Sequence, residues 1–131
     1  MAFTKKNLSE LENVAPKFGM PEGMAAHFPR RDLGLETVGF GYMRLAPGFR
    51  IPFGHKHGEQ EEIYVVVRGS GRVKVDDEII DLEVGDVLRV EAGTMRNFEG
   101  GPQGIEYVAF AAGDAELAKT DAEMVPGWWA D

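Results

Sequence analysis

The sequence has no cysteine, which excludes disulfide bridges, thiolate catalysis and zinc sites built from cysteine. It also lacks a clustered basic face, and the formal net charge is −8 over 131 residues. A nucleic-acid binder normally carries such a face, and an anionic membrane surface repels a chain of this charge. Neither nucleic acid nor a membrane is therefore expected as a partner.

Long apolar runs are missing as well. The N-terminal stretch MAFTKKNLSELENV lacks the continuous apolar segment of a signal peptide. No segment approaches the length of a transmembrane helix. The resulting expectation is a cytoplasmic protein.

Glycine, by contrast, is abundant, with 17 residues, while runs of helix-forming residues are scarce. This composition favours a β-rich chain with many tight turns. The length fits one domain with a single core.

From residue 36 onward, short apolar runs alternate with turn signals. Turns recur at roughly eight to twelve residues, a spacing typical of a β-sandwich or barrel. The segment 72–75 is expected to pair with 79–82 across an acidic turn. Strands are predicted over residues 37–45, 62–67, 72–75, 79–82, 86–90, 95–99 and 105–111.

The two ends of the chain differ from this body. Residues 1–35 are predicted to form an irregular arm, because residues 15–24 contain two prolines and two glycines. In the tail 113–131, Asp114 is predicted to cap a short helix, which the segment 126–129 (PGWW) cannot continue. The strands would then occupy residues 36–112, with the tail packing on them or on a partner subunit.

Two of the three histidines stand close together in the segment 52–67, PFGHKHGEQEEIYVVV. Residues two apart in a strand share a face, so His55 and His57 would present both imidazoles to one side. Glu62 follows at an odd spacing, so a turn must re-aim the chain, and Gly58 supplies the freedom for it. Two imidazoles on one face form half of a metal site, although these residues alone also fit a solvated polar loop.

The wider segment 47–73, PGFRIPFGHKHGEQEEIYVVVRGSGRV, resembles the first motif of the cupin family. That motif reads Gly, about five residues, His-x-His, three or four residues, Glu, six residues and Gly. Here Gly48 is followed by six residues, the two histidines, four residues, Glu62, six residues and Gly69. The spacing selects Glu62 over Glu61. The segment 85–100, GDVLRVEAGTMRNFEG, is similar to the second motif from Gly85 to Gly93.

The resemblance implies an all-β, single-domain double-stranded β-helix, the antiparallel jelly roll of the cupin barrel, whose interior can hold one small ligand. It also implies a divalent metal with His55, His57 and Glu62 as ligands. Fe, Mn, Ni, Cu and Zn all suit two imidazoles and a carboxylate. Because cupins commonly pair their barrels, the resemblance further implies a homodimer.

Arg96 stands where the family's fourth ligand, a histidine, is expected. Arginine stays protonated and has no lone pair to donate, so it cannot replace that ligand. In one outcome the metal survives on three ligands, as in the facial triad of non-haem iron sites, and Arg96 holds a substrate anion. In a second the metal is lost and Arg96 pairs with Glu62. In a third Arg96 is solvated at the rim.

Tyr64 and Phe98 are the other candidate ligand contacts. Tyr64 shares the face of Glu62 and can donate a hydrogen bond to a ligand, although such a tyrosine more often fills a barrel. Phe98 shares a face with Arg96 and is expected to line the cavity. Tyr42 and Arg44 share a face of the 37–45 strand, but alternation does not decide whether that face is inward.

Two classes of function follow from the resemblance. The first is an enzyme performing metal-dependent oxygenase, isomerase or lyase-type chemistry on a small polar or anionic molecule. The second is a metal-free, non-catalytic sensor or carrier of a small molecule, in which Arg96 pairs with Glu62. The fold by itself does not decide between them.

Overall fold

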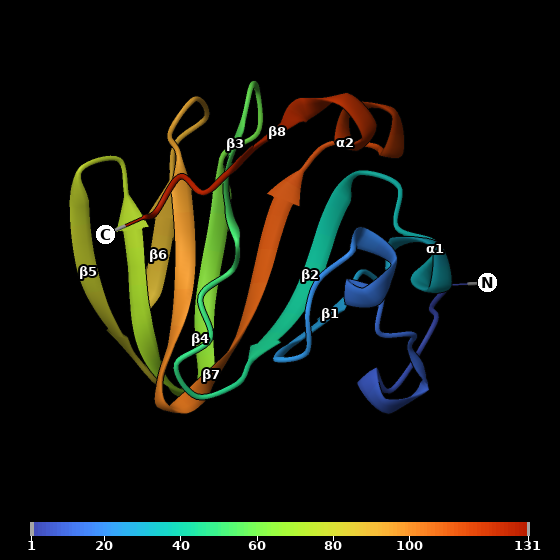
Figure 1. Ribbon diagram of the computed structural model, residues 1–131. Helices are drawn as coiled ribbons and strands as arrows, with labels where there is room; N and C mark the ends of the chain where they lie inside the picture. The colour runs from blue at the N-terminus through green and yellow to red at the C-terminus, as the bar shows by residue number, and fades with distance from the viewer. Residues whose placement is uncertain (1, 131) are drawn as a thin grey trace.

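The computed structural model describes residues 2–130, and in this part of the chain the strands form a single curled, eight-stranded antiparallel sheet (Figure 1). The strands are β1 (Met24–His27), β2 (Val38–Leu45), β3 (Phe53–His57), β4 (Glu62–Val75), β5 (Glu78–Glu83), β6 (Val87–Val90), β7 (Arg96–Ala112) and β8 (Ala122–Pro126). The helices are α1 (Arg30–Leu33) and α2 (Ala115–Asp121), and 3-10 turns occur at η1 (Leu8–Glu10) and η2 (Ala15–Phe18). Over residues 2–130, no helix combines the length and the apolar character that crossing a bilayer demands.

The all-β architecture predicted from the turn spacing is present, and two long strands give it its curl. β4 pairs with β6 through residues 62–65 and with the second half of β7 through residues 62–69. It pairs with β5 through residues 70–75 and with the first half of β7 through residues 71–75. The pairing register shifts between Val66 and Arg68 and between Gly69 and Gly71, which bends both strands. The predicted hairpin of 72–75 with 79–82 is confirmed, with Val73 opposite Ile80.

The sequence predicted that strands end at residues 69–71 and 100–104. This prediction is wrong, because one continuous strand runs through each of these segments. Segments 62–67 and 72–75 are both parts of β4, and segments 95–99 and 105–111 are both parts of β7. Gly69 explains how the strand passes through this bend: it has φ of +74°, and a β-carbon there would overlap the carbonyl oxygen of Gly104. Only glycine allows the two backbones this close an approach.

The tail begins as predicted and then departs from the prediction. Asp114 caps α2 by accepting a hydrogen bond from the backbone N–H of Leu117, at 3.0 Å. Directly after this helix the chain forms β8, which pairs with β3 from Phe53 opposite Pro126 to His57 opposite Ala122. The tail therefore packs on the sheet of its own chain. Trp129 is buried there, with the Arg50 guanidinium 4.1 Å from its ring centroid.

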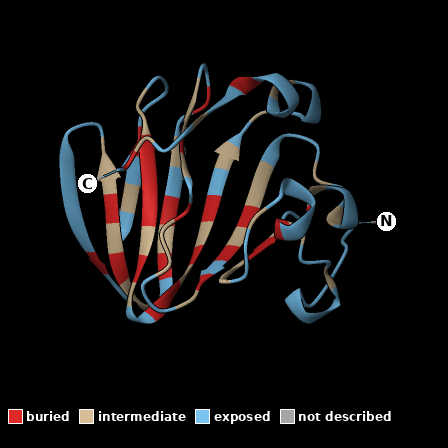
Figure 2. Cartoon of the chain, viewed as in Figure 1, coloured by how far each residue is buried: buried red, intermediate tan, exposed pale blue. Residues whose placement is uncertain are grey.

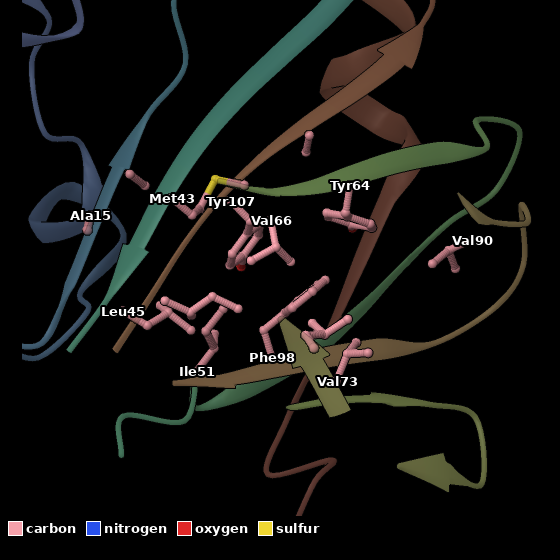
Figure 3. Close-up of a cluster of buried hydrophobic side chains, with 14 residues drawn as sticks. Ala15, Met43, Leu45, Ile51, Tyr64, Val66, Val73, Val90, Phe98 and Tyr107 are labelled. Atoms are coloured by element: carbon pink, nitrogen blue, oxygen red, sulfur yellow. The ribbon is translucent and has the colours of Figure 1, made fainter. Parts of the chain in front are cut away.

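Side chains fill the interior of the curl. Figure 2 shows the buried segments along the central strands, whereas β5 is largely exposed. Aromatic rings form the middle of the core, where Phe98 stacks on Tyr107 at 4.4 Å and contacts Tyr64 at 4.7 Å between ring centroids (Figure 3). Each of these three side chains belongs to the buried core. Burial of apolar side chains, these rings among them, is the main favourable contribution to folding.

The outer face of the sheet is partly apolar. Ile63 on β4 lies opposite Phe110 on β7, and both are exposed, as are Val67 and Val87. An exposed apolar patch on a sheet is commonly covered by a partner. The homodimer implied by the resemblance stays a prediction.

Candidate metal centre

The three residues selected by the motif spacing converge at one end of the sheet. His55 and His57 share one face of β3, with their ring centroids 5.3 Å apart. The turn at 58–60 brings in Glu62, the first residue of β4. Its Oε1 lies 3.6 Å from Nε2 of His55 and 3.4 Å from Nε2 of His57. One potential ligand atom from each residue lies within 4.8 Å of those of the other two.

Arg96 points into the same cluster and is completely buried, so the solvated alternative is excluded. Its Nη2 donates to Oε1 of Glu62 at 2.7 Å, its Nε donates to the hydroxyl of Tyr64 at 2.9 Å, and its Nη1 donates to the carbonyl oxygen of Thr94 at 2.9 Å. The Tyr64 hydroxyl in turn donates to Oε1 of Glu62. All three nitrogens of the guanidinium are therefore already engaged.

The electrostatics of the cluster set its protonation state. Burial opposes ionisation of Glu62, but the contacts with His55 and His57, the hydrogen bond from Tyr64 and the charge of Arg96 outweigh it and hold the pKa of Glu62 far below its usual range. Burial lowers the pKa of His55, against the opposing effect of its hydrogen bond to Glu62. Burial also raises the pKa of Tyr64. At neutral pH the site therefore holds a neutral His55 and an ionised Glu62.

These shifts predict that the metal-free protein loses stability on acidification. For both groups the folded pKa lies below the unfolded value, so the unfolded chain binds protons more readily and the stabilising contribution is lost as pH falls. The loss begins near the ordinary pKa of 6.5 for His55 and continues below 4.5 for Glu62. Urea unfolding at a series of pH values between 7.5 and 4 measures it. His55→Gln should flatten the upper part of the profile and Glu62→Gln the lower part; a wild-type profile without slope would contradict the prediction.

Asp121 is a site residue that the sequence did not reveal. It is the last residue of α2, it is buried, and its Oδ2 lies 3.3 Å from Nδ1 of His57. Its Oδ1 accepts a hydrogen bond from the backbone N–H of Glu59 at 2.8 Å, and its Oδ2 accepts one from Gln60 at 3.0 Å. The available signal was its position, because a carboxylate at a helix C-terminus opposes the helix dipole and needs another reason to be there.

The remaining candidates lie outside or beneath the cluster. Tyr64 places its hydroxyl in the cluster and its ring in the core, while Phe98 lies deeper, against that ring. The open question about Tyr42 and Arg44 is settled: their face is outward, because the buried residues of β2 are those of the opposite face, Gly41, Met43 and Leu45.

One hollow near the surface lies away from the histidines. A hollow of about 900 Å³ lies between the N-terminal arm and the edges of β2, β4 and β7, with Arg44, Arg68 and Glu106 in its wall. At the histidine cluster the side chains are only partly open, from 12% exposure for His57 to 26% for His55. The three side chains are therefore only narrowly accessible from solvent.

Comparison with known proteins agrees with this architecture. Residues 41–100 match the family model described as "Cupin domain". This chain contains a cupin domain. The match begins in β2 and ends within β7, so it includes both histidines, Glu62 and Arg96. Compared with curated proteins, the chain has no significant match.

Solved structures share the fold of this cupin domain. A cupin protein from Bacteroides fragilis is similar with a TM-score of 0.70 and 22% identity, covering 88% of this chain and 87% of that one. Oxalate decarboxylase from Bacillus subtilis is similar with a TM-score of 0.72 and 24% identity. The match covers 93% of this chain but only 33% of the oxalate decarboxylase chain. KdgF from Halomonas sp. is similar with a TM-score of 0.63 and 15% identity, and the match covers 74% of this chain and 86% of the KdgF chain. These likenesses confirm the predicted all-β jelly roll, and at such identities they show the fold alone.

Proposed function

We propose that this cupin domain binds one divalent transition metal through His55, His57 and Glu62, and that the centre takes a small anionic or polar ligand. The observation that supports this is the convergence of two imidazole nitrogens and one carboxylate oxygen within 4.8 Å, from two different strands. A neutral imidazole and an ionised carboxylate are the forms in which these groups bind metals. Fe, Mn, Ni, Cu and Zn all suit this donor set.

Arg96 makes the fit of a metal weaker than in a four-ligand centre. Its positive charge balances that of Glu62 before any cation enters, so a divalent metal together with the Asp121 carboxylate behind His57 would give the site a net charge of about +1. Such a centre favours an anionic ligand, and a bound metal would polarise an oxygen of that ligand as a Lewis acid. Because Arg96 is completely buried and donates to Glu62, Tyr64 and Thr94, we assign it the role of orienting Glu62 rather than of contacting the ligand.

Metal analysis of the purified protein tests this proposal. Protein prepared without a chelator or a histidine tag is expected to contain close to one transition-metal ion per chain, or to take one up on titration with Zn²⁺, Mn²⁺ or Ni²⁺. His57→Ala should remove it, because two donors bind far more weakly than three. His27→Ala is the matched control, since His27 lies on β1 and contacts the carbonyl oxygen of Glu12.

A metal-free binding protein is the second candidate. The observation that favours it is the 2.7 Å ion pair between Arg96 and Glu62, which balances the charge of Glu62 without any metal. Oxalate is the first ligand to test, because one of the structurally similar proteins is by name an oxalate decarboxylase. Wild-type protein that takes up no metal and yet binds oxalate would exclude the metal centre and support this candidate.

A further inference from the structure

Asp121 contacts the cluster from a segment outside the matched cupin residues 41–100. Both of its oxygens accept hydrogen bonds from backbone N–H groups in the turn that joins the two halves of the cluster, at Glu59 and Gln60. The carboxylate therefore offers only acceptors to its surroundings. It is also nearly inaccessible, with a side-chain exposure of 3%.

The ring nitrogen that faces Asp121 has no other partner. Nδ1 of His57 is buried and makes no regular hydrogen bond within the described residues, and Oδ2 of Asp121 lies 3.3 Å from it. A carboxylate oxygen facing an imidazole nitrogen favours a proton on that nitrogen. The lone pair is then on Nε2, which is the atom that faces Glu62 at 3.4 Å.

Two lone pairs facing each other across 3.4 Å repel unless a cation lies between them. The tautomer favoured by Asp121 therefore leaves the lone pair of Nε2 of His57 available to bind a metal. When no metal is bound, this nitrogen has no favourable partner. The C-terminal segment also holds the strand that carries the two histidines. β8 forms five residue pairings with β3, whereas β7 forms one.

We propose that Asp121 is a positioning residue that holds His57 with its proton on Nδ1 and its lone pair on Nε2. The C-terminal segment thus completes the site that β3 and β4 begin. The inference rests on the proposed metal centre for its purpose, but the tautomer itself is a property of the metal-free chain.

Nitrogen-15 NMR of the histidine side chains in metal-free protein tests it. The chain has only three histidines, so each signal can be assigned with His27→Gln, His55→Gln and His57→Gln variants. In the wild type, His57 is expected as the Nδ1-protonated tautomer. In Asp121→Ala the Nε2-protonated tautomer should become the major form, and affinity for Co²⁺ should fall roughly 10–100-fold.

Two further variants keep the test decisive. Asp121→Asn retains the shape of the side chain in case Asp121→Ala releases the turn at 58–60, and it should weaken Co²⁺ binding in the same direction. Glu123→Gln is the matched control on β8: Glu123 is exposed, pairs with Lys56 at 3.6 Å, and its loss should change neither the tautomer nor the affinity.

The outcomes separate this inference from the proposed function. If the tautomer follows Asp121 but no variant binds Co²⁺, the metal centre is wrong and the positioning role stands. If wild type and Asp121→Ala bind Co²⁺ equally tightly with the same His57 tautomer, the positioning role is wrong and the metal centre stands. An Nε2-protonated His57 in the wild type would also overturn the positioning role.

Discussion

The Arg96→His variant is expected to bind a divalent transition metal at least about 100-fold more tightly than the wild-type protein. Arg96 lies opposite His55 in the β3–β7 pairing and reaches Oε1 of Glu62 at 2.7 Å, so its charge lies next to any metal held by the three ligands. A single pair of unit charges 4 Å apart repels by about 4 kcal/mol at the effective dielectric constant of a partly buried site. A divalent ion roughly doubles this repulsion, and the new imidazole adds a fourth donor.

Competition titration against a chromophoric chelator measures this change. Arg96→Gln separates the two contributions, because it removes the charge without adding a donor, and it should show a smaller gain than Arg96→His. Arg68→His is the matched control, since Arg68 is largely exposed and lies near Glu106, away from the cluster. Equal metal affinity in Arg96→His and wild type would show that position 96 does not face the metal. If the ligand binds at an open coordination position of the metal, Arg96→His should also bind the ligand more weakly, because the fourth donor fills one of these positions.

The Arg96→Met variant is expected to be less stable than wild type by about 3–5 kcal/mol in the absence of metal. Removing the guanidinium leaves the ionised Glu62 without its cation, and it takes a donor away from the hydroxyl of Tyr64 and from the carbonyl oxygen of Thr94. An uncompensated charge at a buried site is among the most destabilising single changes. Such a loss is a large part of the total stability of a domain of this size.

A double-mutant cycle in urea identifies the cause of this loss. Arg96→Met combined with Glu62→Gln should recover part of the stability, because the second change removes the charge that the first leaves unpaired. Arg68→Met is the comparison, since its 79% exposed side chain faces Glu106 at 3.7 Å and its loss should cost less than about 1 kcal/mol. A double variant as unstable as the sum of the two single variants would show that Arg96 stabilises the fold through its packing rather than through Glu62.

The strands between residues 37 and 111 and the cluster of His55, His57 and Glu62 were predictable because they depend on short-range periodicity. Alternation places His55 and His57 on one face wherever the strand lies, and the turn at Gly58 provides the correction that brings Glu62 to them. Glycine positions were less informative. Gly69 and Gly71 look like the end of a strand, but β4 continues through them because β7 pairs with it on both sides of the bend. A glycine that ends a strand and one that bends it have the same local signature.

The last strand could not be predicted for a different reason. The segment AEMVP of β8 has an acidic residue and a terminal proline, and it has little intrinsic preference for a strand. It becomes one because β3 has an unpaired edge there, and hydrogen bonds to that edge provide the stabilisation. Pairing between segments so far apart in the chain depends on the assembled sheet and leaves no local pattern.

By itself, the sequence determined the all-β class, the cupin motif and the three side chains that can share a metal. Each of these follows from spacing along a few neighbouring residues. Only the tertiary structure decided that Arg96 is buried against Glu62 and Tyr64 instead of lying at the rim, and that Asp121 lies behind His57. The direction of a long charged side chain and the partner of a ring nitrogen depend on which strands lie side by side, and that is fixed only when the sheet closes.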